Sequence, residues 1–167
     1  LLDEAVYGLP EIRPEQIAAA RLVASPGCYP TSVILPLLPL LADGLIDPES
    51  IQVVSMSGTS GAGRKADASL LFAECNESLR AYSVPRHRHL SEIEQELSIA
   101  ASRKVTISFT PVLSPVTSGI YTTIYAASRG GTGADDLHHS LGKAYGDSTF
   151  VRLLGENNPP DTKNVTH

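Results

Sequence analysis

The stretch Ser25-Pro26-Gly27-Cys28-Tyr29-Pro30-Thr31 decides how the rest of the chain is interpreted. Its Pro-Gly pair disfavours a helix and predicts a turn. Residues 31–42 are mostly Val, Ile and Leu, which predicts a buried helix despite two prolines. The turn places Cys28 at or just before a helix N-terminus, where free N–H groups and the helix dipole favour a thiolate, an oxyanion or a phosphate. A single cysteine before an apolar helix is also a common small core residue, so both interpretations stay open at this point.

The composition is that of an ordinary globular domain. The chain has 167 residues, enough for one sizeable core, and a net charge of -5. Its 13 Lys and Arg residues are scattered, which argues against a nucleic-acid partner. The apolar run at 32–42 is too short to span a membrane and contains prolines. Sparse cysteine (Cys28 and Cys75) and no visible secretory signal predict a cytoplasmic protein.

Hydrophobic patterning predicts an α+β fold with a mixed sheet and helices packed on one face. Ser91 and Glu94 have the spacing of a capping box, which predicts a helix start near Ser91. The strands at 105–112 and 119–127 are expected to be neighbours, and residues 66–80 show no clear pattern. The pattern predicts helices over 14–20, 31–42, 91–101 and 135–145, and strands over 21–24, 51–57, 105–112, 119–127, 150–154 and 163–166.

A glycine-rich loop follows the strand at 51–57. It reads Gly58-Thr59-Ser60-Gly61-Ala62-Gly63-Arg64-Lys65. Small residues let a backbone approach an anion closely, and Arg64 and Lys65 add positive charge. The glycine spacing does not fit a nucleotide P-loop. The same pattern is equally compatible with a flexible surface loop that carries two solvated cations.

Two histidines precede the helix at 91–101, in the segment Arg86-His87-Arg88-His89. The flanking arginines repel a cation, so we expect no metal site here. Either imidazole can act as an acid or base near neutral pH, and we favour this role over that of plain surface residues. By contrast, His138 and His139 lie on a predicted amphipathic helix and are expected to face solvent.

Seven segments along the chain form a combined pattern. In order, they are Val6-Tyr7-Gly8-Leu9-Pro10-Glu11, Pro26-Gly27-Cys28-Tyr29-Pro30-Thr31, residues 57–66, His87-Arg88-His89, Glu92-Ile93-Glu94-Gln95, Phe109-Thr110-Pro111 and Phe150-Val151-Arg152-Leu153-Leu154. Together they resemble the N-acetyl-gamma-glutamyl-phosphate reductases. The resemblance covers nearly the whole chain, and the cysteine turn combined with His-x-His is a specific pairing.

The resemblance implies a particular domain organisation. In that family a Rossmann domain binds NADP, and a second domain carries the cysteine, the substrate site and the dimer interface. Residues 1–167 then form that single catalytic and dimerisation domain, a fragment without the Rossmann domain. The implied fold has a mixed, largely antiparallel sheet, similar to the glyceraldehyde-3-phosphate dehydrogenase catalytic domain. No Gly-x-Gly-x-x-Gly follows a strand, which agrees. A homodimer or homotetramer is expected.

The implied activity is NADP-dependent reduction of N-acetylglutamyl 5-phosphate to the 5-semialdehyde, in arginine biosynthesis. Cys28 is expected to form a thioester, and His89, or else His87, to move the proton. Glu92 is expected to orient the imidazole. The resemblance further implies that Arg64, Lys65, Arg86, Arg88 and Ser60 bind the substrate, and that Gly27, Ser57, Gly58 and Gly61 contact the cofactor.

The chain departs from the family pattern at a few positions, notably Ser32 for Gly or Ala, Pro36 for a smaller residue, and Ser118 for an arginine before Gly119. If that arginine holds a substrate anion, its role passes to the cations at 64, 65, 86 and 88. Two alternatives stay open. One is a related semialdehyde dehydrogenase that acts on another acyl phosphate. The other is a non-catalytic dimerisation module in which Cys28 only packs.

Overall fold

The structure is a computed structural model that describes residues 2–155 and 157–164. Its helices are α1 (Pro14–Ala19), α2 (Cys28–Ala42), α3 (Phe72–Cys75), α4 (Leu90–Ala100) and α5 (Ala134–Tyr145). Its strands are β1 (Val6–Tyr7), β2 (Val23–Ala24), β3 (Gln52–Ser57), β4 (Arg80–Ala81), β5 (Ser108–Leu113) and β6 (Ile120–Tyr125). Short 3-10 turns cover Leu2–Glu4, Thr59–Ala62, Ala68–Leu70 and Thr162–Asn164.

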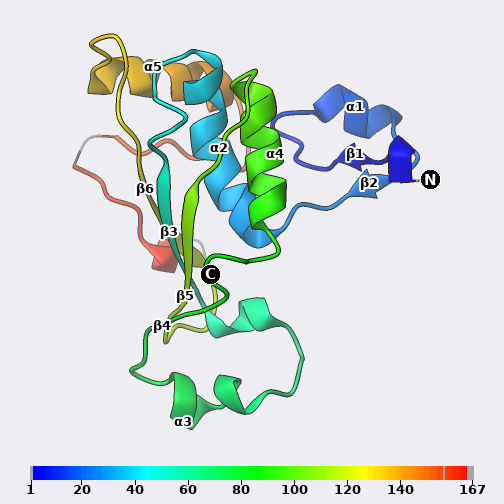
Figure 1. The fold of residues 1–167 in the computed structure, drawn as a ribbon, viewed down its shortest axis with the longest axis vertical. Coiled ribbons are helices and arrows are strands. Elements are labelled where there is room, and N and C mark those ends of the chain that lie inside the picture. The colour runs from blue at the N-terminus through cyan, green and yellow to red at the C-terminus, as the bar shows by residue number, and fades with distance from the viewer. Residues whose placement is uncertain (1, 156, 165–167) are drawn as a thin grey trace.

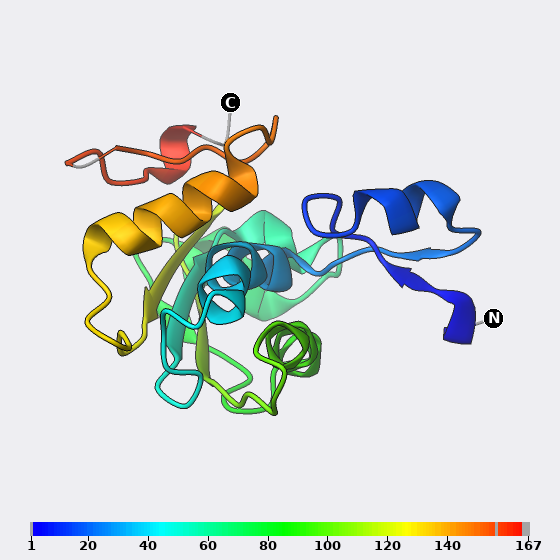
Figure 2. The same ribbon diagram turned by 90° about the horizontal axis from the view of Figure 1, so that it is seen from above.

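The main sheet has four strands in the order β4-β5-β3-β6. β3 pairs with β5 in parallel and with β6 antiparallel, and β4 pairs with β5 antiparallel. α2 and α4 lie side by side against the sheet, and α5 packs against α2 (Figures 1 and 2). The predicted α+β class, with a mixed and largely antiparallel sheet, is confirmed.

One hydrophobic cluster joins the helices to the sheet. Inward-facing side chains of β3 and β5, such as Val53 and Phe109, meet Val33 of α2 and Leu97 of α4. The strand predicted over 51–57 produces this arrangement, because successive side chains of a strand point to opposite faces. The core therefore holds α2 rigidly against the strand ends, and the first residue of α2 is Cys28.

α2 contains two prolines, and one of them is compensated by a distant residue. Pro39 has no N–H, so the carbonyl of Leu35 lacks its helical donor. The hydroxyl of Tyr145, at the end of α5, donates to that carbonyl over 2.7 Å. Burial raises the pKa of Tyr145 to about 12, which keeps the hydroxyl protonated as a donor. α5 thus supplies one hydrogen-bond donor that the helix beginning at Cys28 lacks.

A series of hydrogen-bonded hydroxyl groups explains why serine at position 32 departs from the family pattern. The Thr122 hydroxyl of β6 donates to Ser32 of α2 over 2.9 Å and lies 2.9 Å from the Ser55 hydroxyl of β3. Ser32 in turn donates to the carbonyl of Tyr29 over 2.9 Å. A hydroxyl at position 32 therefore satisfies buried polar groups that a glycine or alanine would leave to other partners.

The N-terminal unit of β1, α1 and β2 projects from the main body and is fastened to α4 (Figure 2). β1 and β2 form a two-stranded parallel sheet. Arg13 forms an ion pair with Glu96 over 2.6 Å, and Glu96 is only 1% exposed. The Tyr7 hydroxyl donates to Glu92 over 2.7 Å. Because a buried carboxylate needs its partner, these contacts fix the segment that leads into the cysteine turn.

The expectation that the strands at 105–112 and 119–127 are neighbours is wrong. β3 lies between β5 and β6. The connecting segment, residues 114–119, crosses the end of β3 and is bound there, since Ser114 donates to the carbonyl of Ser57 and Gly58 donates to that of Gly119. Backbone bonds from Thr59 and Ser60 to residues 116 and 117 continue the crossing. Residues 114–119 therefore do not join β5 and β6 as a hairpin.

Three further predictions need correction. Residues 150–154 form no strand, because no neighbouring strand pairs with them. The strand predicted at 163–166 is a 3-10 turn as far as residue 164, and residues 165 and 166 lie outside the described part. The Ser91–Glu94 capping box is absent, since α4 begins at Leu90 and the Glu94 carboxylate accepts the N–H of Ile107 instead. The predicted helices themselves, at 14–20, 31–42, 91–101 and 135–145, are confirmed within a few residues.

Candidate active site

Cys28 is the first residue of α2 and its side chain is exposed. The N-cap is Gly27, and the helix begins with the bond from Thr31 N–H to the Gly27 carbonyl at 3.1 Å. Helix geometry leaves the N–H groups of Cys28 and Tyr29 without an intrahelical acceptor, and Pro30 has no N–H to leave unpaired. The predicted position of the cysteine at a helix N-terminus is confirmed.

The imidazole of His89 packs directly on the glycine before the cysteine. A Cβ atom placed on Gly27 would lie 2.6 Å from Nε2 of His89, which is far inside contact distance. Glycine is therefore required so that the ring can approach the backbone beside Cys28. His89 is the N-cap residue of α4, so two helix N-termini meet at this point.

Glu92 holds the cysteine turn rather than the histidine ring. Its Oε1 accepts hydrogen bonds from the N–H of Gly27 at 3.0 Å and from the hydroxyl of Tyr7 at 2.7 Å. Among the described residues, the buried Nδ1 of His89 has no hydrogen-bond partner. The expected role of Glu92 as the direct partner of the imidazole is therefore not seen. The carboxylate instead fixes the backbone that positions Cys28.

The surroundings of both histidines favour the neutral form of the imidazole. Burial lowers the pKa of His89 below its ordinary value; the Glu92 carboxylate opposes this shift and Arg88 adds to it. Burial also lowers the pKa of His87, and the neighbouring His89 and Arg88 act in the same direction. A neutral imidazole beside a thiol can accept its proton, which is the state that a general base needs at neutral pH.

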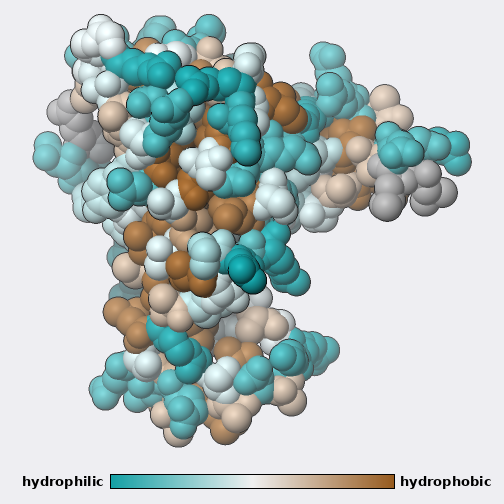
Figure 3. All heavy atoms as spheres, in the orientation of Figure 1, coloured by the Kyte–Doolittle hydropathy of each residue, from teal (hydrophilic) through white to brown (hydrophobic). Residues whose placement is uncertain are grey.

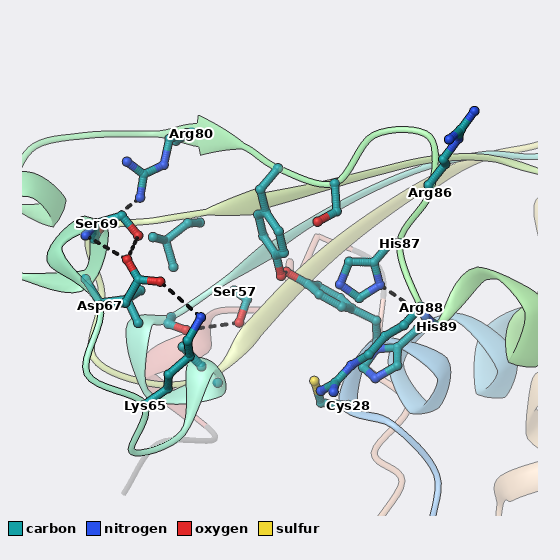
Figure 4. Close-up of a pocket in the computed structure, with 18 residues that line it drawn as sticks. Cys28, Ser57, Lys65, Asp67, Ser69, Arg80, Arg86, His87, Arg88 and His89 are labelled. Atoms are coloured by element: carbon teal, nitrogen blue, oxygen red, sulfur yellow. Dashed lines mark hydrogen bonds and ion pairs between the residues drawn. The ribbon is translucent and has the colours of Figure 1, made fainter.

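A cavity of about 630 Å³ opens beside these residues, within the size range of small-molecule sites (Figure 4). It brings together most of the predicted site residues from segments far apart in the sequence. Those that line it are Cys28, Ser57, Gly58, Gly61, Lys65, Arg86, His87, Arg88 and His89. Gly27 and Glu92 lie just behind this lining, as their contacts with His89 and with the cysteine turn show.

Two predicted substrate residues do not line the cavity. Arg64 and Ser60 belong to the loop after β3, but both side chains are exposed and neither reaches the cavity wall. Two glycines of this loop, Gly58 and Gly61, have packing reasons for lacking a side chain. A Cβ on Gly58 would lie 2.7 Å from the N of Ser118, and one on Gly61 would lie 2.9 Å from Oγ of Ser57. Their role toward a cofactor stays a prediction.

The wall opposite Cys28 carries cations that already have partners. Lys65 lies 3.4 Å from the Asp67 carboxylate, which also accepts from the N–H and hydroxyl of Ser69. Arg80 donates to the Ser69 carbonyl over 2.9 Å. The Asp67 charge weakens this wall as an anion site, because it repels the anion that Lys65 attracts.

Arg86 and Arg88 differ from Lys65 in this respect. Within the described ranges, neither guanidinium lies in an ion pair. Arg88 acts electrostatically on His87, His89 and Tyr82, so its charge lies within the site. Figure 4 shows Arg86 directed away from Cys28. Arg88 is therefore the cation best placed to attract a substrate anion near the sulfur.

Sequence analysis missed several cavity residues. Tyr29 and Tyr82 line the cavity, with their hydroxyls 2.8 Å apart, and Asp67 and Arg80 complete the far wall. Three of these four lie within or next to residues 66–80, where no periodic pattern gave a signal. Tyr29 follows the cysteine directly and could have been found from its place at the helix start. No group of three metal-ligating side chains occurs in the part of the chain that the structure describes.

Residues 28–167 match the family described as semialdehyde dehydrogenase, dimerisation domain, and the chain belongs to this family. Its most similar relatives include N-acetyl-gamma-glutamyl-phosphate reductases. The chain is 60% identical to that of Akkermansia muciniphila and 52% identical to that of Rhodospirillum rubrum, in each case over 99% of this chain. These relatives confirm the resemblance found in the sequence.

The chain spans about half the length of these relatives, 48% and 47% respectively. A relative from Arabidopsis thaliana, named a probable chloroplastic N-acetyl-gamma-glutamyl-phosphate reductase, is 50% identical over 99% of this chain and 41% of its own.

Solved structures share the fold at low identity. Aspartate semialdehyde dehydrogenase II from Vibrio cholerae superposes with a TM-score of 0.64 at 17% identity, covering 96% of this chain and 56% of that one. The same enzyme type with NADP from Candida albicans gives 0.58 at 14% identity, covering 82% and 44%. The predicted fold relationship is thus confirmed. No helix in the described ranges is long and apolar enough to cross a bilayer.

Proposed function

We propose that this chain is the catalytic and dimerisation half of a cytoplasmic, NADP-dependent reductase that converts N-acetylglutamyl 5-phosphate to the 5-semialdehyde, a step of arginine biosynthesis. One observation carries the proposal. An exposed cysteine begins α2 at the edge of a cavity, and the His89 ring packs on the glycine before it. The reductase names of relatives at 50–60% identity support the choice of substrate.

Cys28 supplies the nucleophile. Its thiolate attacks the acyl carbon, the bond from that carbon to the phosphate oxygen breaks, and phosphate leaves, so that a thioester remains on the sulfur. The free N–H groups of Cys28 and Tyr29 are the candidate donors to the oxyanion that forms during this attack. A thioester suits the next step because it accepts hydride more readily than an oxygen ester.

His89 moves the proton. Its neutral imidazole accepts the proton of the Cys28 thiol, which generates the thiolate. Once hydride has added to the thioester carbon, the same imidazole protonates the resulting alkoxide. It takes that proton back when the carbon–sulfur bond breaks and the aldehyde leaves. The close packing of its Nε2 edge on Gly27 supports this assignment.

The residues beside Cys28 fit a nicotinamide ring. Ser57, Gly58 and Gly61 line one wall of the cavity with small side chains, which leaves open space for a flat group next to the sulfur. NADPH, when bound, supplies the hydride. We place most of its binding surface on a Rossmann domain outside this chain, so the chain alone is expected not to turn over. Arg88, with Lys65 and Arg86, is the candidate for the substrate anions, because guanidinium binds carboxylate and phosphate in a bidentate manner.

The proposal predicts substrate-dependent oxidation of NADPH by the full-length protein. With N-acetylglutamyl phosphate, absorbance of NADPH should fall and phosphate and aldehyde should appear in equal amounts. Aspartyl phosphate tests the rival semialdehyde dehydrogenase, and it should react at least about tenfold more slowly, the difference that 1.4 kcal/mol of transition-state binding gives. Faster reaction with aspartyl phosphate would establish the rival. No reaction with either would favour the non-catalytic module.

The sheet face opposite α2 and α4 is the surface we assign to a second copy of the chain. It exposes apolar side chains on adjacent strands, among them Met56 of β3 with Tyr121 and Tyr125 of β6. Figure 3 shows hydrophobic surface in the middle of the molecule, between the helical part and the projecting segment below. The family is described as a dimerisation domain, and contiguous apolar surface on a sheet face is what a dimer interface needs.

Tyr125→Arg should therefore weaken the oligomer. Tyr125 is 63% exposed, so the change leaves the core intact, while a charge in the interface is left without a partner on the facing copy. Sedimentation velocity of the full-length protein should show a smaller species than wild type at equal concentration. Ile99→Arg is the matched control, because Ile99 is 59% exposed on α4, on the other side of the sheet. Equal sizes for Tyr125→Arg and wild type would show that the copies meet elsewhere.

A further inference from the structure

His87 is locked in place by rings from four parts of the chain. Its ring centroid lies 5.3 Å from that of Tyr29 on α2, 5.5 Å from Tyr82 after β4, 4.9 Å from His89 and 5.7 Å from Phe109 on β5. All four contacts are edge-to-face, with interplanar angles from 68° to 86°. Such packing fixes the plane of the imidazole, so its two nitrogens keep fixed directions.

One of these nitrogens must be unprotonated. The backbone N–H of His89 donates to Nδ1 of His87 over 3.2 Å. A nitrogen that accepts a hydrogen bond carries a lone pair, not a proton. In the neutral imidazole the single proton then sits on Nε2. The local backbone thus selects the tautomer of the side chain two residues before it.

The protonated nitrogen has no protein partner. His87 lines the cavity, and among the described residues its ring makes a hydrogen bond only through Nδ1. Figure 4 shows the hydrogen bond to His89 on one side of the ring, with the other ring nitrogen on the side away from it. An N–H held in this way is ready to donate to a ligand in the cavity.

We propose that His87 is a fixed, neutral hydrogen-bond donor to an anionic oxygen of the substrate, a phosphate or carboxylate oxygen, and that it takes no part in proton transfer. Only the identity of the substrate rests on the function proposed above. The donor role follows from the ring packing and the backbone bond. It leaves His89 as the single acid–base histidine of the pair.

Protonation of His87 is opposed from every side. The second proton would have to go to Nδ1, where it would face the N–H of His89 and break the existing hydrogen bond. The groups around the ring that carry or can gain charge are Tyr29, Tyr82, His89 and Arg88, and none of them is a carboxylate. The lowered pKa of His87, caused first by burial, agrees with this.

Nitrogen-15 NMR tests the tautomer directly. Full-length protein labelled at histidine nitrogen should show, for the signals that disappear in His87→Gln, an unprotonated Nδ1 and a protonated Nε2 between about pH 7 and 8. A proton on Nδ1, or an imidazolium within this range, would overturn the proposal. The measurement needs no activity, so it remains decisive even if the protein fails to reduce the expected acyl phosphate.

Two anions then identify the oxygen that is recognised. Inorganic phosphate and, separately, N-acetylglutamate are added to the labelled protein. A shift of the Nε2 signal of His87 with phosphate alone assigns the phosphate oxygen, and a shift with N-acetylglutamate alone assigns a carboxylate. If neither anion moves the signal up to concentrations that perturb other site residues, the donor role is wrong.

Kinetics of matched variants separates donation from proton transfer. The amide nitrogen of Gln can occupy the place of Nε2, while Asn is too short to reach it. If His87 only donates, His87→Gln should keep kcat/KM within about tenfold of wild type, and His87→Asn should lose roughly ten- to a hundredfold. Neither variant should remove a limb from the pH–rate profile. Equal, larger losses in both variants together with a lost limb would make His87 an acid or base.

Discussion

Cys28→Ser in the full-length protein should lower kcat for acyl-phosphate reduction by roughly a thousandfold or more, the loss typical when a covalent nucleophile is removed. A serine hydroxyl in the same place is a far weaker nucleophile at neutral pH, because an alcohol gives up its proton far less readily than a thiol. The binding residues of the cavity stay in place, so KM should change much less than kcat. Steady-state rates with N-acetylglutamyl phosphate measure both. A variant rate close to that of wild type would remove the covalent step.

The second cysteine provides an internal control for this prediction. Cys75 is buried at 7% exposure and its thiol donates to the Ser69 carbonyl, whereas Cys28 is exposed at the cavity edge. Iodoacetamide at neutral pH should therefore alkylate Cys28 first, with activity lost in proportion, as peptide mass mapping would show. Slow and equal labelling of the two cysteines would instead favour the non-catalytic module.

His89→Asn should lower kcat by about 10²- to 10⁴-fold, the usual contribution of a general acid–base group. The loss should exceed that of His87→Asn, because only the His89 ring packs on the backbone next to the sulfur. Asparagine is smaller than histidine, so the close packing on Gly27 is relieved rather than worsened. Thermal unfolding of the variant is the control for folding. A larger loss at His87 would reverse the assignment.

The pH–rate profile provides a second measure of His89. Burial lowers the pKa of this imidazole below the 6.5 of an unperturbed histidine. The neutral base is the form present above its pKa, so activity is expected to fall with decreasing pH only below 6.5 in wild type. That acidic limb should disappear in His89→Asn and remain in His87→Gln.

The sequence was sufficient for the parts that depend on local pattern. The Pro-Gly turn and the apolar run placed Cys28 at a helix start, and the structure confirms this with Cys28 as the first residue of α2. Alternation identified β5 and β6, the strand predicted over 51–57 corresponds to β3, and the amphipathic pattern identified α5. Family motifs also identified half of the residues that line the cavity.

The errors share a cause, which is pairing between distant segments. Nothing in the sequence of residues 114–119 reveals that this segment crosses the end of β3. As a result, β3 lies between β5 and β6, which follow one another in the sequence. Residues 150–154 have a strand-like composition but no partner, and a strand exists only when its backbone groups are paired. Glu92 has the right spacing to reach His89, yet its carboxylate accepts hydrogen bonds from Gly27 and Tyr7 instead.

The support of α2 by Tyr145 has a consequence for assembly of the site. The helix that presents the sulfur lacks one of its own donors at Pro39, and the replacement comes from a residue 110 positions away from Leu35. An isolated helix with such a gap is unstable in water. In a nascent chain from which α5 has not yet emerged, Cys28 therefore lies on a helix that still lacks this hydrogen bond. The site around Cys28 should therefore become reactive late in folding, after α5 has packed against α2.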